Sequence, residues 1–297
     1  MSDSGAGRRL RVAFQGERGA FSEEAIVALL GENVELVPRA TFEDLFSAIR
    51  EGAADLALAP LENSLAGSVH QSYDLLLESD YHIVDEVTIP IAHYLIGVPG
   101  AALDGVRVVQ SHPVALAQCL GFFAKHPRIQ RVASTDTAGS VREIMEKGDP
   151  AAAAIAARRA AAVYGGEILL EHLEDHRENY TRFALLSPDA IVGDGANKLS
   201  LIVRVKHVPG ALHSALGAFA TRGVNLMKIE SRPIKGTPWN YSFYLDLEGS
   251  TTETRVIEAF EELRQNGHEY RVLGCYPAAR SVSNASAATG TASRAQN

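Results

Sequence analysis

Short apolar runs alternate with helical patterns over the first two thirds of the chain. Residues 10–14, 34–37 and 56–59 have the apolar character of strands, and residues 22–30 have helical spacing. Thr41–Asp44 has the form of a capping box that opens another helix. The alternation continues through predicted strands at residues 91–98, 107–110, 129–133 and 152–155, and predicted helices at residues 113–125 and 137–147. Strands that alternate with helices indicate βαβ units and a largely parallel sheet.

A second pattern begins near residue 198, after a stretch rich in Pro, Gly, Asp and Asn. It predicts strands at 199–205, 225–232, 241–247 and 270–275, and helices at 209–222 and 252–265. The order βαββαβ is that of a ferredoxin-like unit. We therefore expect an α/β domain at residues 8–188, divided into two lobes around 82–90, and a ferredoxin-like domain at 198–276. Residues 277–297 have almost nothing apolar to bury, so we expect a disordered tail.

Composition excludes several classes of protein. The net charge is −8, from 36 acidic and 28 basic side chains, with no basic stripe that would indicate a nucleic-acid partner. No apolar run is long enough to span a membrane, and residues 1–9 lack the apolar segment of a secretion signal. We expect a cytoplasmic protein in which Cys119 and Cys275 are free thiols.

Familiar cofactor and nucleophile motifs are missing from the chain. It has no phosphate-binding Walker sequence, no H-E-x-x-H and no G-x-S-x-G, and Gly16–Ser22 lacks the spacing of a dinucleotide fingerprint. His172 and His176 are four residues apart, but no third ligand is evident, so a solvated face explains them better than a metal site. We predict neither a metal nor a cofactor.

Polar clusters follow several predicted strands, where open α/β sheets bind ligands. Glu62, Asn63 and Ser64 follow one strand. Ser111 precedes Pro113, which favours the first turn of a helix, where unpaired N–H groups attract a carboxylate. From the pattern alone, ordinary turns and helix caps explain these clusters about as well as a ligand site does.

In this order and spacing, the clusters resemble the prephenate dehydratase family, which includes the plant arogenate dehydratases. The resemblance covers about residues 10–276 and is carried by Pro60–Ser64, Ser111–Pro113 with Gln118–Cys119, Ser134–Thr135 with Thr137–Ala138, Asn179–Phe183, Gly210–His213 and Glu230–Pro233. Glu17 and Ala20 stand where the family often has Pro and Thr, and Val114 where Gln is common. These differences leave the choice of substrate open.

The resemblance implies a catalytic region of two lobes, like a type II periplasmic binding protein, followed by a ferredoxin-like ACT domain. It implies decarboxylative dehydration of prephenate to phenylpyruvate in L-phenylalanine biosynthesis, with L-phenylalanine as an allosteric effector bound at a subunit interface. A homodimer or homotetramer is then expected. Two other functions stay open: dehydration of arogenate, and a non-catalytic amino-acid sensor on the same fold.

The resemblance also assigns residues to roles. Thr181 would contact the leaving hydroxyl, Arg182 would bind a carboxylate, and Glu62 would be a second candidate acid. The predicted substrate-binding residues are Asn63, Ser64, Ser111, Gln118 and Phe183. The predicted effector-binding residues are Gly210, Ala211, Leu212, His213, Asn225, Leu226, Glu230 and Ser231.

Overall fold

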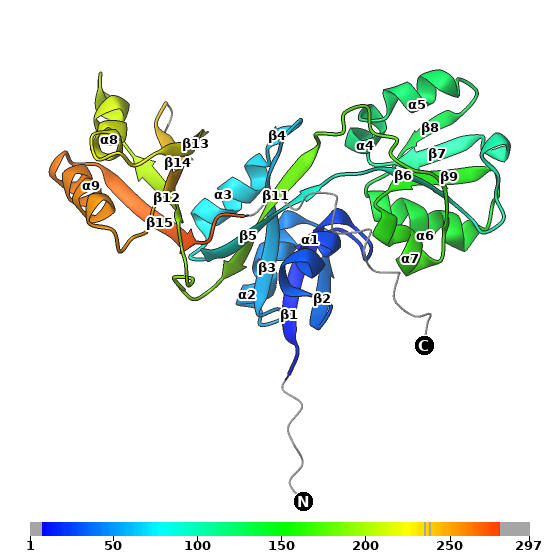
Figure 1. The fold of residues 1–297 in the computed structure, drawn as a ribbon, viewed down its shortest axis with the longest axis horizontal. Helices are drawn as coiled ribbons and strands as arrows, with labels where there is room; N and C mark the ends of the chain where they lie inside the picture. Colours follow the sequence, from blue (N-terminus) through cyan, green and yellow to red (C-terminus); the bar gives the residue numbers. More distant parts are fainter. Residues whose placement is uncertain (1–7, 235, 238, 280–297) are drawn as a thin grey trace, which may run out of the picture.

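Three units lie in a row, with lobe 1 between lobe 2 and the C-terminal domain (Figure 1). The computed structural model describes residues 8–234, 236–237 and 239–279, so most of the predicted tail lies outside the described residues. The chain enters lobe 2 from lobe 1 through residues 91–93 and returns through residues 171–179. These two segments form the hinge between the lobes.

Lobe 1 has a mixed sheet rather than the largely parallel one that the sequence predicted. Its strand order is β2-β1-β3-β11-β5, with β1 parallel to its neighbours and β11 antiparallel to β3 and β5. The reason is the route of the chain, because β5 leaves toward lobe 2 and β11 comes back beside it. The elements are β1 Leu10–Gln15, α1 Phe21–Leu30, β2 Val34–Arg39, α2 Phe42–Arg50, β3 Leu56–Asn63, β4 Gly67–Ser68, α3 His70–Glu78, β5 His82–Pro90 and β11 Tyr180–Ser187.

Lobe 2 has a sheet of order β10-β6-β9-β7-β8. The single helix predicted at residues 113–125 is wrong, because the structure has two short helices that break at Gln118 and Cys119. The elements are β6 Tyr94–Gly97, η1 Leu103–Gly105, β7 Val108–Ser111, α4 Pro113–Ala117, α5 Leu120–Lys125, β8 Gln130–Ala133, α6 Thr137–Lys147, β9 Ala152–Ala156, α7 Arg158–Tyr164 and β10 Glu167–Leu170.

The C-terminal domain confirms the predicted βαββαβ order. Its antiparallel sheet has the strand order β13-β14-β12-β15, and α8 and α9 pack against each other and against one face of the sheet. The elements are β12 Lys198–Arg204, α8 Ala211–Ala220, β13 Leu226–Pro233, β14 Tyr241–Glu248, α9 Thr254–Gln265 and β15 Glu269–Tyr276.

Both faces of the lobe 1 sheet are buried. Phe183 and Leu185 of β11 belong to a core shared with lobe 2, whereas Ala184 and Leu186 belong to a core shared with the C-terminal domain. Successive side chains of a strand point to opposite faces, which explains the division. From Phe183 to Leu186, successive residues of β11 therefore belong alternately to the core shared with lobe 2 and to the core shared with the C-terminal domain.

Cys119 and Cys275 are buried free thiols, as expected. No helix within the described residues has both the length and the apolar character needed to cross a membrane. Within the same residues, no group of three or more His, Cys, Asp or Glu side chains is arranged to hold a metal ion.

Candidate functional site

Thr181 lies next to the hinge and is held by Asn63. It is opposite Asn63 in the pairing of β11 with β3, and its Oγ1 accepts a hydrogen bond from Asn63 Nδ2 at 2.9 Å. The sequence predicted that the third strand ends at residue 59, but β3 continues to Asn63. Glu62 and Asn63 are therefore strand residues on opposite faces rather than neighbours in one loop.

A chain of hydrogen bonds joins Thr181 to His93 across the hinge. Asn63 Nδ2 donates to Asn179 Oδ1 at 2.7 Å, and Asn179 Nδ2 donates to Gln118 Oε1 at 3.2 Å. His93 Nε2 lies 2.8 Å from the same oxygen of Gln118. We call these five residues the hinge network. It joins predicted site residues from both lobes.

His93 was missed by the sequence analysis. Its ring is buried and forms a T-shaped contact with the ring of Phe21, with the ring centroids 5.6 Å apart. Burial lowers the pKa of His93, although Gln118 and Glu174 act in the opposite direction, so the ring is neutral near pH 7. A polar residue within the apolar stretch from Ile91 to Tyr94 was the only available signal.

Arg182 and Glu62 lie on the face of the sheet opposite Thr181. Arg182 Nη1 is 2.8 Å from Asp246 and 3.0 Å from Glu86, and Glu62 is 2.8 Å from Lys228. Asp246 and Lys228 belong to the C-terminal domain. The structure therefore does not bring these two predicted catalytic residues to the side of Thr181.

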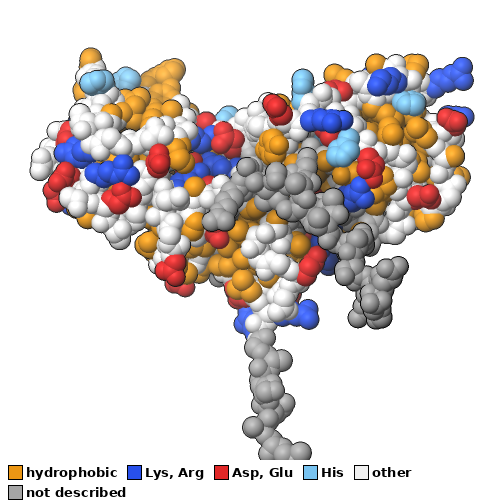
Figure 2. All heavy atoms as spheres, viewed as in Figure 1, with side chains coloured by type: hydrophobic (Ala, Val, Ile, Leu, Met, Phe, Trp, Pro, Cys, Tyr) orange, Lys and Arg blue, Asp and Glu red, His pale blue; other side chains and the backbone are white. Residues whose placement is uncertain are grey.

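A buried group of alternating charges joins lobe 1 to the C-terminal domain. Arg182 and Lys198 both contact Glu86 and Asp246, and all four side chains are at most 11% exposed. Burial opposes the charge of Arg182, but Asp246 and Glu86 outweigh this effect and raise its pKa. We call these four residues the junction cluster. The cluster itself is buried, and Figure 2 shows other acidic and basic side chains close together on the surface where the C-terminal domain meets lobe 1.

Strand β13 contacts lobe 1 through every second residue. Lys228 bonds to Glu62, Glu230 accepts a hydrogen bond from Ser68 at 2.7 Å, and Arg232 pairs with Asp74 at 2.7 Å. The predicted effector residue Glu230 therefore lies against lobe 1, 3.4 Å from His70, whereas Ser231 is exposed. Lobe 1 thus has direct polar contact with β13.

The other predicted substrate-binding residues either donate hydrogen bonds to backbone carbonyls or pack in the core. Ser64 Oγ donates to the carbonyl of Glu178 at 2.9 Å, and Ser111 Oγ donates to the carbonyl of Ile155 at 2.6 Å. Phe183 is in the core between the lobes. None of these three side chains is part of the hinge network.

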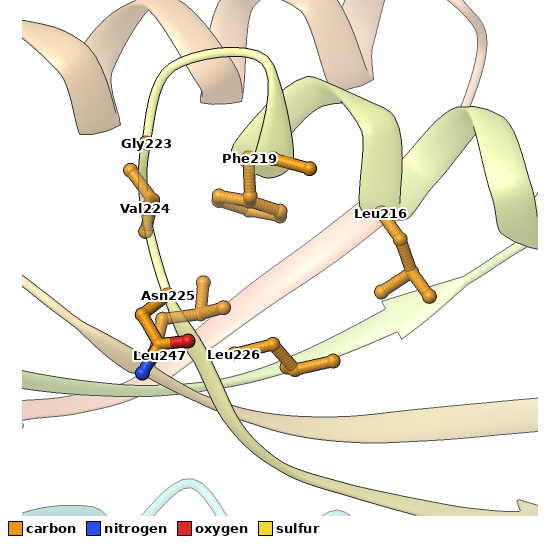
Figure 3. A pocket seen from close by; sticks show the side chains of 8 residues that line it. Leu216, Phe219, Gly223, Val224, Asn225, Leu226 and Leu247 are labelled. Atoms are coloured by element: carbon orange, nitrogen blue, oxygen red, sulfur yellow. The ribbon is translucent and has the colours of Figure 1, made fainter.

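Two cavities lie in the C-terminal domain. One, of 420 Å³, is lined by Phe219, Asn225 and Leu226 among others (Figure 3). The second, of 380 Å³, is lined by Ala211 and Leu212 at the start of α8. Gly210 caps α8 with a positive φ of 81°, and His213 is exposed. Four of the eight predicted effector residues thus line cavities, two in each, whereas Gly210, His213, Glu230 and Ser231 line neither.

Comparisons with known proteins agree with this arrangement. Residues 12–191 match the family model for prephenate dehydratase and residues 199–265 match the model for the ACT domain. The chain is 39% identical over 292 residues to arogenate dehydratase/prephenate dehydratase 1, chloroplastic, of Arabidopsis thaliana, covering 93% of this chain and 74% of that one.

Two solved structures have the same fold along most of the chain. One, described as a prephenate dehydratase in complex with L-Phe from Arthrobacter aurescens, has a TM-score of 0.83 and 33% identity, covering 91% of this chain and 90% of that one. The other, described as GqqA, a novel type of quorum quenching acylases, has a TM-score of 0.83 and 36% identity, covering 90% of this chain and 98% of that one.

The chain belongs to the prephenate dehydratase family and ends in an ACT domain. It is a lyase of aromatic amino acid biosynthesis, with a two-lobed catalytic region and a ferredoxin-like regulatory domain.

Proposed function

We propose that this enzyme converts prephenate to phenylpyruvate and that L-phenylalanine regulates it. The observation that carries the proposal is the position of the Thr181 hydroxyl, which Asn63 holds beside the hinge between the two lobes. The family and fold supply the reaction class, and the hinge network supplies donors of the kind that the reaction needs.

The reaction breaks two bonds and needs one proton. The electrons of the bond between C1 and its carboxylate move into the ring as carbon dioxide leaves. The C4–oxygen bond breaks, and the departing hydroxide takes a proton and becomes water. Formation of the aromatic ring drives the reaction. The protein must therefore place a donor at the leaving oxygen, which is general acid catalysis or hydrogen bonding.

Thr181 is the residue we place at the leaving oxygen. A threonine hydroxyl is a very weak acid, so it donates a hydrogen bond or relays a proton from the substrate or water. Gln118, in the second lobe, is the partner that we expect to bind a substrate oxygen. Closure of the lobes around a dianionic substrate would let Thr181 and Gln118 donate hydrogen bonds to the same substrate molecule.

For Arg182 and Glu62 the structure supports a regulatory role better than a catalytic one. Each neighbours a hinge-network residue in its strand, since Arg182 follows Thr181 and Glu62 precedes Asn63. Their side chains contact Asp246 and Lys228 of the ACT domain. A shift of the ACT domain would therefore move the backbone that carries Thr181 and Asn63.

We propose that L-phenylalanine binds the ACT domain where two copies of the chain meet. The two cavities hold different subsets of the predicted effector residues, and a second copy could bring one cavity against the other. Both are lined largely by apolar side chains, which suits a phenyl ring. Phenylalanine alters activity only if it binds two conformations unequally.

The first test measures turnover of the purified chain. Prephenate and arogenate are supplied separately, and phenylpyruvate and phenylalanine are followed with and without added phenylalanine. We expect turnover of prephenate that changes with phenylalanine. Thr181→Val should lower kcat by about 10²–10⁴-fold, the usual value of a positioned proton donor. Thr181→Ser should keep most of the activity, and Thr254→Val, at an exposed position of α9, is the matched control.

The alternatives have distinct outcomes. Turnover of arogenate alone would replace the proposed substrate. Binding of phenylalanine without any turnover would favour a sensor. An acylated amine is a further substrate to include, because one structural neighbour is described as an acylase; its cleavage without turnover of prephenate or arogenate would overturn the proposal.

A further inference from the structure

The orientation of the Asn63 side chain is fixed by backbone groups. Asn63 Oδ1 accepts hydrogen bonds from the backbone N–H groups of Leu65 and Ala66, at 3.0 and 2.8 Å. A backbone N–H can only donate, so the oxygen must lie on this side and the NH₂ group on the other. The NH₂ group faces Asn179 Oδ1, the carbonyl of Tyr180 and Thr181 Oγ1.

This orientation determines every other donor in the hinge network. Because Asn63 donates to Asn179, the nearer atom of Asn179 is its oxygen and the farther one its nitrogen. Asn179 therefore donates to Gln118, which must accept through Oε1. His93 Nε2, at 2.8 Å from that oxygen, must then carry the proton, and Nδ1 is the unprotonated nitrogen. Nδ1 of His93 is buried and has no hydrogen-bond partner within the described residues.

Two members of the network, Thr181 and Gln118, have hydrogens that the network does not use. Thr181 Oγ1 accepts from Asn63, so its own proton is directed elsewhere. In the part of the chain that the structure describes, the side-chain hydrogen bonds of Gln118 both end on Oε1, which leaves its NH₂ group as a donor. Asn63, by contrast, has acceptors for both of its amide hydrogens and donors for its oxygen.

We infer that Asn63 is a positioning residue, which sets the direction of the hinge network so that the Thr181 hydroxyl and the Gln118 amide are presented as donors to the substrate. The inference rests on the proposed function and revises the predicted role of Asn63 as a substrate-binding residue. A dianionic substrate with a leaving hydroxyl needs donors, and the network supplies one from each lobe.

Asn63→Asp reverses the direction of the hydrogen bonds in the network, while the side chain at position 63 keeps nearly the same size and shape. The new carboxylate keeps the bonds from Leu65 and Ala66 but can only accept on its other side. Thr181 then donates its proton to this carboxylate. The side-chain amides of Asn179 and Gln118 flip, so that their oxygen and nitrogen atoms exchange places. The ring of His93 moves its proton to Nδ1, because Gln118 now donates to Nε2.

The test combines kinetics with nitrogen NMR of labelled histidine at pH 7.5. We expect Asn63→Asp to lower kcat about 100-fold, as loss of a positioned donor does, and to change the tautomer of His93 from Nε2–H to Nδ1–H. The His93 signal is identified by its loss in His93→Gln. Asn266→Asp makes the same change at the exposed end of α9 and should leave both readouts as in the wild type.

A second variant keeps the inference testable if Asn63→Asp does not fold. Gln118→Glu removes the donor in lobe 2 but still accepts from His93 and Asn179. We expect KM to rise several-fold, kcat to stay within a few-fold of the wild type, and His93 to keep its proton on Nε2.

The outcomes separate this inference from the proposed function. Wild-type kcat in Asn63→Asp, or a lower kcat with an unchanged His93 tautomer, would overturn the inference while the function stands. A Gln118→Glu variant with the KM and kcat of the wild type would also overturn it, because the Gln118 amide would then not be a donor to the substrate. Absence of any turnover in the wild type would refute the function, and the tautomers would still report the direction of the network.

Discussion

For single residues, the register of neighbouring strands decides what each predicted site residue contacts. Thr181 is opposite Asn63 and Arg182 is opposite Glu62, so two adjacent positions in β11 face different neighbours. The family resemblance singled out these four residues as candidate site residues. It could not show that Asn63 bonds to Thr181 or that Arg182 pairs with Asp246, because those contacts join segments more than 60 residues apart.

Gly274 allows two strands to approach each other closely because it has no side chain. It lies in β15, and a Cβ at this position would be 2.0 Å from the carbonyl oxygen of Ile83 in β5. We expect Gly274→Ala to separate the C-terminal domain from lobe 1 and to destabilise the protein by about 1–3 kcal/mol or more, the usual cost of overpacking. Thermal unfolding and proteolysis of the linker at residues 188–197 measure the effect.

Gly217→Ala is the matched control for this prediction. Gly217 lies in the middle of α8, where a Cβ would meet no atom within 4 Å. Alanine in a helix is favoured over glycine by about 0.5–1 kcal/mol, so this variant should be slightly more stable than the wild type. Equal stability of the two variants would contradict the proposed close contact at Gly274.

For strands and helices, local signals predicted most elements but misplaced those that depend on tertiary pairing. Residues 137–147 were predicted as a helix with the bounds of α6, because the apolar spacing and the Asp136 cap are local. The third strand was predicted to end at residue 59, because proline normally marks the end of a central strand. This prediction was wrong. The structure accommodates Pro60 with a register shift opposite Phe183, and β3 continues to the predicted site residues Glu62 and Asn63.

Strand β13 gives a prediction about regulation. Lys228→Met removes the ion pair with Glu62 but keeps the length of the side chain. We expect near-normal turnover without effector and a several-fold weaker response to phenylalanine, because coupling energies of about 1–3 kcal/mol are typical of allosteric proteins. Turnover against phenylalanine concentration, together with calorimetric binding, measures the response.

Lys147→Met, at the exposed end of α6, is the control for this strand prediction. It should respond to phenylalanine as the wild type does. If Lys228→Met keeps the full response, the contact between β13 and lobe 1 does not carry the signal. Loss of phenylalanine binding itself would point to a damaged effector site rather than to lost coupling.

Across the three units, the sequence predicted the domain order and the ferredoxin-like connectivity, which follow from local periodicity. It did not predict that lobe 1 lies between the other two units, because this depends on β11 inserting between β3 and β5. Nor did it predict the junction cluster, whose charges come from strands of two domains. His93 was missed for a similar reason, because its contact with Gln118 joins segments that are distant in the sequence.

Burial of His93 predicts a dependence of stability on pH. Its pKa is lowered in the folded protein, so below about pH 6.5 the unfolded chain binds a proton that the folded protein excludes. The free energy of unfolding should therefore fall with falling pH below about 6.5, by at most about 1.4 kcal/mol per pH unit for this group, until the folded pKa is reached.

His93→Gln keeps a hydrogen-bond donor for Gln118 and removes the titration. Its chemical denaturation midpoint should depend less on pH than that of the wild type between about pH 6.5 and 5. His176→Gln changes an exposed histidine of the hinge and should retain the wild-type profile. Parallel pH profiles for wild type and His93→Gln would show that His93 is not protected from protonation.

The position of β11 also determines the order in which the protein can be assembled during synthesis. Lobe 2 is continuous in sequence and leaves the ribosome complete, whereas β3 and β5 of lobe 1 must wait for the strand that joins them. Unpaired strand edges of this kind are where nascent chains associate wrongly. The second lobe can therefore fold first, and the strand that carries Thr181 completes the first lobe last, so this threonine reaches its place only when the whole two-lobed region has been translated.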